Sequence, residues 1–141
     1  LNNYIKKNCI WSVRSASISE IEKYNILNAT LIAMKRAIIK LKKKPNLVLI
    51  DGNKLPLIKN YNLKYIVKGD QKIPEISAAS IVAKVSRDRL MSKMSKKYTK
   101  YLWNKNSGYG TKDHISAIKK FGITKYHRKT FRPVHNILSP K

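Results

Sequence analysis

Apolar and polar positions follow one another along the chain in an order that predicts both strands and helices. Residues 10–17 alternate between apolar and polar side chains, which predicts a half-buried strand. In residues 27–41 the apolar positions recur at steps of four and three, which predicts one face of a long amphipathic helix. Ser19 and Glu22 have capping-box spacing and favour a helix start there, and residues 42–45 supply cations and a proline stop at its end.

Two short apolar runs follow. Residues 47–50 form an uninterrupted apolar run, which is typical of a strand buried on both faces of a parallel sheet. Residues 65–67 predict a second strand, Pro74 favours the start of the next helix, and residues 107–111 are expected to form a loop. Residues 112–121 predict a last regular helix that is closed by glycine. Strands and helices in this order indicate an α/β fold.

Length and composition fit one globular domain. The chain has 141 residues, of which 43% are hydrophobic, so it can bury a single core. Its longest apolar runs are far shorter than the roughly 20 residues of a membrane span, and no signal-peptide core follows the first residues. Cys9 is the only cysteine, which excludes an internal disulfide framework and a multi-cysteine zinc site. We therefore expect a cytoplasmic protein without a membrane partner.

The charge points to a polyanionic partner. Thirty-one lysines and arginines against seven acids give a formal net charge of +24. Nucleic acid is the simplest partner for such a chain, because its phosphates release counterions when cations bind them. The abundance of Lys, Asn, Ile and Tyr is also what an AT-rich coding bias produces whatever the function, so both interpretations stand at this point.

Two of the seven acids stand directly after the predicted apolar strands. Asp51 follows the first strand and Asp70 follows the second, and ligands bind at the carboxyl ends of strands in open α/β sheets. Carboxylates beside a phosphate substrate favour Mg²⁺ or Mn²⁺, and two such ions can clamp the oxygens of a phosphodiester under attack. The competing interpretation is that both aspartates are ordinary turn residues.

Other side chains are candidates for contacts to a nucleic acid or for support of the site. Tyr109 stands between two glycines, where it can stack on a sugar or base or can anchor its loop to the core. Asp88 lies between Arg87 and Arg89 on a predicted helix, so we expect it to pair with a neighbouring cation rather than to bind a metal. Two lysines are candidate phosphate contacts: Lys68 and Lys84.

Several blocks of residues occur along the chain in a characteristic order. They include Ser17-Ile18-Ser19-Glu20-Ile21, Leu49-Ile50-Asp51-Gly52-Asn53, Val67-Lys68-Gly69-Asp70, Ser77-Ala78-Ala79-Ser80-Ile81-Val82-Ala83-Lys84-Val85, Arg87-Asp88-Arg89, Gly108-Tyr109-Gly110-Thr111 with His114, and His127-Arg128. With these blocks the chain resembles bacterial ribonuclease HII, the type 2 ribonuclease H, over nearly its whole length. The resemblance implies an RNase H-like mixed sheet flanked by helices, with residues 1–141 forming one domain and a helical C-terminal part from about residue 111.

The resemblance also implies an activity. Members cleave the RNA strand of RNA/DNA hybrids and cut 5′ to ribonucleotides embedded in duplex DNA, as in ribonucleotide excision repair, with Mn²⁺ or Mg²⁺ as the cofactor. Asp51 and Asp70 match two of the four metal-binding catalytic carboxylates, and Tyr109 matches the tyrosine that contacts the sugar at the RNA–DNA junction. The implied products carry 3′-hydroxyl and 5′-phosphate ends, and the implied state is a monomer.

The chain departs from the family pattern at its start. The adjacent Asp-Glu pair, the Gly-Arg-Gly motif and the Asp-Ser-Lys segment are not found in it, so the N-terminal strands of the fold are expected to be missing. We expect an incomplete sheet, exposed apolar surface, and little or no cleavage by this chain alone, whether it is a fragment or the product of a decayed gene. Asn106-Ser107 also stands where many members carry His-Lys.

Two other hypotheses account for the charge. A non-catalytic basic nucleic-acid-binding protein explains +24 equally well, but it gives no reason for carboxylates at two strand ends, which repel phosphates unless a metal lies between. A catalytically dead remnant that retains hybrid binding shares every feature except turnover. A pure binding protein is expected to be indifferent to Asp51→Asn, or to bind better.

Overall fold

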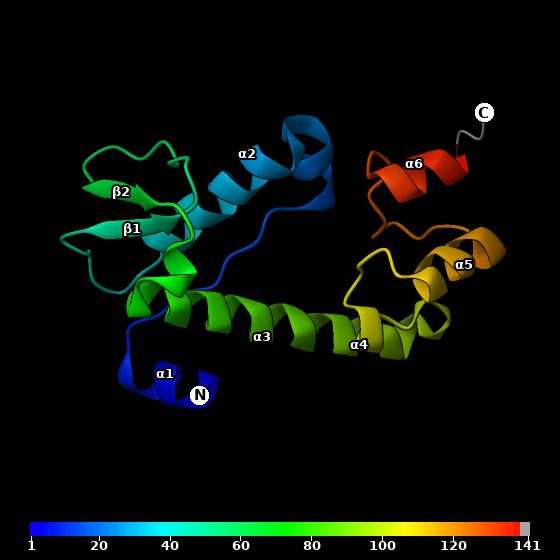
Figure 1. Cartoon of the computed structure of the whole chain (residues 1–141), viewed down its shortest axis with the longest axis horizontal. Coiled ribbons are helices and arrows are strands. Elements are labelled where there is room, and N and C mark those ends of the chain that lie inside the picture. The colour runs from blue at the N-terminus through cyan, green and yellow to red at the C-terminus, as the bar shows by residue number, and fades with distance from the viewer. Residues whose placement is uncertain (139–141) are drawn as a thin grey trace.

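The computed structural model describes residues 1–138, with a small sheet at one end of the molecule and the last helices of the chain at the other (Figure 1). The helices and strands are, in chain order, α1 (Asn2–Asn8), α2 (Ile18–Ile39), β1 (Val48–Asp51), β2 (Leu63–Ile66), α3 (Pro74–Lys97), α4 (Trp103–Asn106), α5 (Lys112–Phe121) and α6 (Arg132–Leu138). The α/β class is confirmed, with a mostly helical composition. Within residues 1–138, no helix combines the length and apolar character that crossing a membrane requires.

The sheet described within residues 1–138 pairs β1 with β2 in parallel, as the uninterrupted apolar run predicted. Ile50 lies opposite Tyr65, and Asp51 lies opposite Ile66, so both strands end at the same edge. The burial on both faces that was predicted for residues 47–50 is only partial: Ile50 is buried, Val48 and Leu49 are half-buried, and Leu47 is 43% exposed. Helix α3 contacts β1 and then extends well beyond the sheet (Figure 1).

The predicted strand at residues 10–17 is not present. This segment has no strand assignment and runs from α1 to α2 without a strand partner in the described part of the chain. A strand is stable only when its backbone amides and carbonyls pair with a neighbour. The alternating pattern therefore does not lead to a strand here, because no neighbouring strand forms hydrogen bonds with this segment.

Helix α2 begins two residues earlier than predicted. Its N-cap is Ser17, whose hydroxyl accepts from the Glu20 N–H while the Glu20 carboxylate accepts from the Ser17 N–H. The capping box is therefore Ser17 with Glu20, and not the predicted Ser19 with Glu22. Both pairs have the same spacing, and the sequence motif alone does not choose between overlapping pairs.

The predicted long helix is also interrupted. Asn25 has φ 69° and ψ 170°, which breaks α2 into two helical segments. Its side chain accepts from the Asn28 N–H at 3.0 Å, as an N-cap does, and so restarts the helix. The apolar stripe is only partly buried, because Ile38 is buried but Leu27 is 48% exposed.

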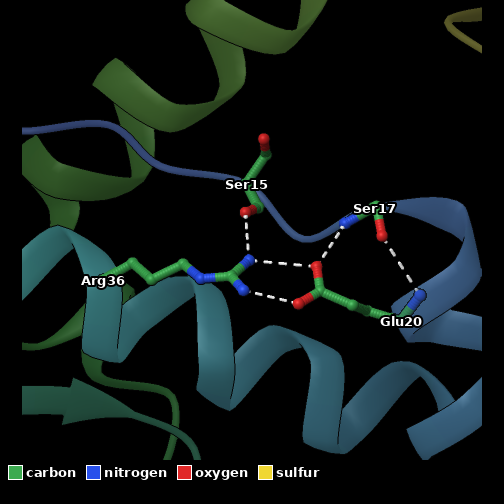
Figure 2. Close-up of polar contacts among 4 residues, drawn as sticks. All are labelled: Ser15, Ser17, Glu20 and Arg36. Atoms are coloured by element: carbon green, nitrogen blue, oxygen red, sulfur yellow. Dashed lines mark hydrogen bonds and ion pairs between the residues drawn. The ribbon is translucent and has the colours of Figure 1, made fainter.

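Arg36 ties the two segments of α2 together (Figure 2). Its Nη1 donates to Glu20 Oε2 and to the Ser15 carbonyl, both at 3.0 Å, and its Nη2 donates to the second Glu20 oxygen. The hydrogen bonds from Arg36, with that from the Ser17 N–H, lower the pKa of Glu20 from 4.5 to about 2. A bidentate pair sixteen positions apart thus fixes the angle at Asn25.

Replacing Arg36 with alanine is expected to raise the pKa of Glu20 toward 4.5, as measured by NMR titration of its carboxyl carbon. Because the folded pKa lies below the unfolded value, the unfolded chain binds protons first as pH falls. The pair therefore stabilises the fold fully above about pH 4.5 and loses its contribution as pH falls toward 2. The exposed neighbour variant Lys35→Ala is the control. An unchanged titration midpoint in Arg36→Ala would contradict the assignment.

The main core lies around the C-terminal half of α3. Helix α3 begins at Pro74 and α5 spans Lys112–Phe121 before Gly122, both as predicted. The short α4 was not predicted, whereas α6 lies in the part from about residue 111 that the resemblance implies to be helical. The buried cluster comprises Met91, Tyr101, Trp103, Ala117, Ile118 and Val134.

Large apolar side chains are exposed on α2 and around the sheet, as the resemblance led us to expect. They are Ile26, Leu27, Ile39, Leu47, Leu57, Tyr65 and Val67. The two ends of the structure thus differ: aromatic packing orders the region of α4 to α6, whereas the sheet region retains apolar surface in contact with water.

Candidate functional site

Asp51 and the residues preceding Asp70 meet at the carboxyl edge of the sheet. The parallel register ends both strands at this edge, and a short 3₁₀ helix, Gly69–Gln71, follows β2. Asp51 Oδ1 accepts a hydrogen bond from the Gly69 N–H at 2.8 Å. Asp70 is the next residue, and both aspartates are exposed. Asp51 and Asp70, which follow the two strands in the sequence, therefore lie in one turn region.

Gly69 allows this turn to pack against α3. It is buried, and a Cβ at this position would lie 2.6 Å from Ile76 Cδ1 and 3.4 Å from Ile66 Cβ. Lys68, directly before it, adopts a left-handed conformation with φ 53° and is exposed. The Lys72 Nζ donates to the Val67 carbonyl at 2.9 Å and closes the turn. A side chain at position 69 would therefore force the end of the Ile76 side chain to move.

The two carboxylates match the oxygen ligands that Mg²⁺ and Mn²⁺ prefer. Among residues 1–138, no group of three or more His, Cys, Asp or Glu side chains is placed to hold a metal ion. Magnesium is commonly held by one or two carboxylates together with waters and substrate phosphates. The donor set at this edge, two exposed carboxylates with one oxygen of Asp51 already bonded to an amide, fits that kind of site.

The loop that carries Tyr109 begins where α4 ends. Ser107 and Gly108 adopt positive φ angles of 49° and 85°, and Asn106 Oδ1 accepts from the Gly108 N–H at 2.8 Å. The Tyr109 N–H donates to the Asn106 carbonyl at 2.9 Å. The Tyr109 side chain is 66% exposed, so the tyrosine does not anchor its loop in the core.

Helix α3 holds this loop through charged side chains. Arg87 Nη2 donates to the Ser107 carbonyl, and the Ser107 hydroxyl donates to Asp88 Oδ1, each at 3.1 Å. Asp88 pairs with Lys84 at 3.6 Å, and not with the adjacent arginines that the sequence suggested. A helical carboxylate reaches the residue four positions away, on the same face, more readily than its immediate neighbours. Lys84 is therefore exposed but already partnered.

The same helix presents a series of other cations. Six basic residues of α3 are exposed to solvent: Lys84, Arg87, Arg89, Lys93, Lys96 and Lys97. Ion pairs within the described residues are limited to Arg36–Glu20 and Lys84–Asp88, so most of the positive charge has no carboxylate partner there. This surface matches the electrostatic pattern of nucleic-acid binding.

Sequence reasoning missed a buried pair of histidines. His114 and His127 are 4% and 7% exposed, and their Nε2 atoms lie 3.2 Å apart. No spacing rule pairs histidines thirteen positions apart across a helix and a loop. The available signal was that both histidines stand in blocks of the family resemblance, His114 after Gly108–Thr111 and His127 before Arg128.

Comparison with known proteins gives a consistent result. The family described as Ribonuclease HII matches residues 2–135. The Ribonuclease HII of Pelagibacter ubique (strain HTCC1062) is 67% identical over 138 residues, covering 98% of this chain and 74% of that protein. The Ribonuclease HII of Ehrlichia ruminantium (strain Welgevonden) is 53% identical over 129 residues, covering 90% and 60% respectively.

A solved structure agrees with the sequence relatives. The crystal structure of the ribonuclease H2 from Pyrococcus horikoshii OT3 superimposes with a TM-score of 0.66 and 26% identity, covering 86% of this chain. The match covers 64% of the archaeal chain and 60% of the Ehrlichia ruminantium protein. The present chain therefore spans less than two thirds of the length of each of these two relatives. The family match over residues 2–135 and the identity to curated relatives together show that the chain belongs to the ribonuclease HII family.

Proposed function

We propose that this chain carries part of the active site of a divalent-metal-dependent endoribonuclease. The enzyme would cleave the RNA strand of RNA/DNA hybrids and cut 5′ to ribonucleotides in duplex DNA, leaving 3′-hydroxyl and 5′-phosphate ends. The observation that carries the proposal is the meeting of Asp51 with Gly69 and Asp70 at one sheet edge. Family membership supports the reaction class.

Asp51 and Asp70 would hold the metal. Bound there, Mg²⁺ or Mn²⁺ would supply Lewis-acid stabilisation of the charge that develops on phosphodiester oxygens. The Gly69 N–H fixes the orientation of the Asp51 carboxylate through one oxygen, which leaves the other free toward solvent. The Gly69 N–H would thus keep the Asp51 carboxylate preorganised for the metal.

Tyr109 and exposed lysines would bind the nucleic acid. The exposed phenol ring would contact the sugar at the RNA–DNA junction, where the 2′-hydroxyl distinguishes RNA from DNA. Lys68, beside the carboxylate turn, and Lys84, on α3, would contact phosphates. Because Lys84 already pairs with Asp88, it would exchange that partner for a phosphate.

Cleavage of a duplex with a single ribonucleotide tests the proposal. The test protein is a chimaera in which this chain replaces the 138 aligned residues of the Pelagibacter ubique relative. In Mn²⁺ or Mg²⁺ we expect a nick 5′ to the ribonucleotide, no cut in an all-DNA duplex, and complete loss of cleavage after metal removal with EDTA. The intact relative and the chain alone are assayed in parallel.

The outcomes separate the two hypotheses. Cleavage by the chimaera that depends on metal supports the endonuclease. A chimaera that folds and binds the duplex but never cuts it, while the intact relative cuts, contradicts the proposed metal site in this chain. That result would favour a non-catalytic basic binding protein.

A further inference from the structure

The buried histidine pair is linked to the backbone of the proposed substrate-contacting tyrosine. His114 lies in the first turn of α5, and its Nδ1 is 2.8 Å from the Tyr109 carbonyl oxygen. His114 Nε2 faces His127 Nε2 at 3.2 Å and accepts from Trp103 Nε1 at 3.2 Å. A continuous series of hydrogen-bonded groups thus runs from the core to the loop between α4 and α5.

The groups that form hydrogen bonds with the two imidazole rings fix the tautomer of each ring. The Thr124 N–H donates to His127 Nδ1 at 2.9 Å, so that nitrogen is an acceptor and the His127 proton is on Nε2. His127 Nε2–H then donates to His114 Nε2, which leaves the His114 proton on Nδ1. That Nδ1–H donates to the Tyr109 carbonyl. His114 Nε2 then accepts from both the His127 and the Trp103 N–H groups, which share its one lone pair.

Both rings must be neutral for the arrangement to hold. A charged His127 would place a proton on Nδ1 against the Thr124 N–H, which is itself a donor. Burial, and then the nearby His114, lower the pKa of His127 from 6.5 to about 4. His127 is therefore neutral at neutral pH, and its Nδ1 can accept from the Thr124 N–H.

This network of hydrogen bonds holds the backbone of Tyr109. Its carbonyl accepts from His114 Nδ1 and also from the Thr111 N–H at 2.9 Å, while its N–H is bonded to Asn106. Its side chain is nevertheless 66% exposed. The peptide groups on both sides of this residue are thus fixed while the ring projects into solvent, which is how a contact residue is kept in place without core packing.

We propose that His114 and His127 are positioning residues, which hold the Tyr109 backbone so that its ring is presented to the sugar of the ribonucleotide. The inference rests on the proposed function for the role of Tyr109. The competing explanation is a purely structural one, in which the two rings only fill the core beside Trp103, and the test must separate the two.

The first experiment examines the pair in this chain without any substrate. Two-dimensional ¹⁵N–¹H NMR of histidine-labelled protein at neutral pH reports the protonation of each ring nitrogen. We expect His114 as the Nδ1–H tautomer and His127 as the Nε2–H tautomer. The reverse tautomers, or a charged ring, would overturn the proposal whatever the protein does to nucleic acids.

The second experiment compares two His114 variants that differ in one hydrogen bond. His114→Phe keeps a ring but removes the donor to Tyr109, whereas His114→Asn keeps an N–H near the Nδ1 position. Amide hydrogen exchange of residues 109–111 is expected to be about tenfold faster in His114→Phe and close to wild type in His114→Asn. The control is His135→Asn on the exposed face of α6. Equal exchange in both His114 variants would overturn the positioning role.

The third experiment asks whether His114 acts through Tyr109. In the chimaera, made non-cleaving by Asp51→Asn, we measure the affinity for a ribonucleotide-containing duplex relative to an all-DNA duplex. We expect His114→Phe to lower this ratio five- to tenfold, and to cause no further loss when Tyr109→Ala is already present.

The two possible failures differ. If His114→Phe lowers the affinity ratio equally with Tyr109 present and with Tyr109→Ala, the histidine acts through core packing alone and the inference is overturned. If Tyr109→Ala itself leaves the ratio unchanged, the proposed function of the tyrosine fails. The tautomer and exchange measurements then still decide whether the histidines position the loop.

Discussion

Replacement of Asp51 by asparagine is expected to lower the cleavage rate of the chimaera about a thousandfold with little change in its stability. A lost metal-binding carboxylate removes several kcal/mol of transition-state stabilisation, and about 4 kcal/mol corresponds to a thousandfold in rate. Stability is retained because asparagine Oδ1 can still accept from the Gly69 N–H, as Asp51 Oδ1 does at 2.8 Å. Single-turnover cleavage and thermal unfolding measure the two effects.

The matched control is Asp113→Asn. Asp113 is exposed in the first turn of α5 and is not part of the proposed metal site, so its removal is expected to leave cleavage unchanged. Cleavage by Asp51→Asn at the wild-type rate would contradict the metal assignment. A large fall in melting temperature would instead show that the negative charge of Asp51 stabilises the β1–β2 edge.

Truncation of Trp103 to alanine is expected to lower the free energy of unfolding by about 3–5 kcal/mol, the usual cost of removing a large buried aromatic side chain. Trp103 is 2% exposed, and its ring stacks on Tyr101 with a centroid separation of 5.3 Å. Its Nε1–H also donates to His114. Urea denaturation followed by circular dichroism measures the loss, which is a large part of the stability of a small domain.

The second tryptophan of the chain provides the control. Trp11 is 44% exposed, and its ring contacts the Lys6 ammonium at 4.1 Å. Trp11→Ala is expected to cost about 1 kcal/mol or less, because little apolar area returns to water and an exposed cation–π contact is weak. Equal losses for the two variants would contradict the placement of the core around α4.

Local features of the fold could be predicted from the sequence where neighbouring residues decide them. Pro74 at the start of α3 and Gly122 after α5 fix helix ends through their own backbone preferences. The run at residues 47–50 predicted a parallel strand correctly. The strand predicted at residues 10–17 failed, because pairing needs a partner that a local pattern does not specify.

The candidate site could be predicted only in part from the sequence. The positions of Asp51 and Asp70 after two strands could be predicted, because parallel strands share a carboxyl edge. Their roles in metal binding remain predictions. The partners of the Tyr109 loop were not predictable, since Arg87 reaches Ser107 from another helix and His114 reaches the Tyr109 carbonyl from inside the core.

By itself, the sequence determined the family, the α/β class, the strong positive charge and the starts of α3 and α5, because these depend on composition, motif order and short-range backbone preference. Only the tertiary structure decided the Asn25 break with its Arg36–Glu20 ion pair, the Asp51–Gly69 hydrogen bond and the buried histidine pair. These contacts join residues between thirteen and eighteen positions apart. Their formation depends on the path of the whole chain and on burial, which changes both hydrogen-bond geometry and the pKa of His127.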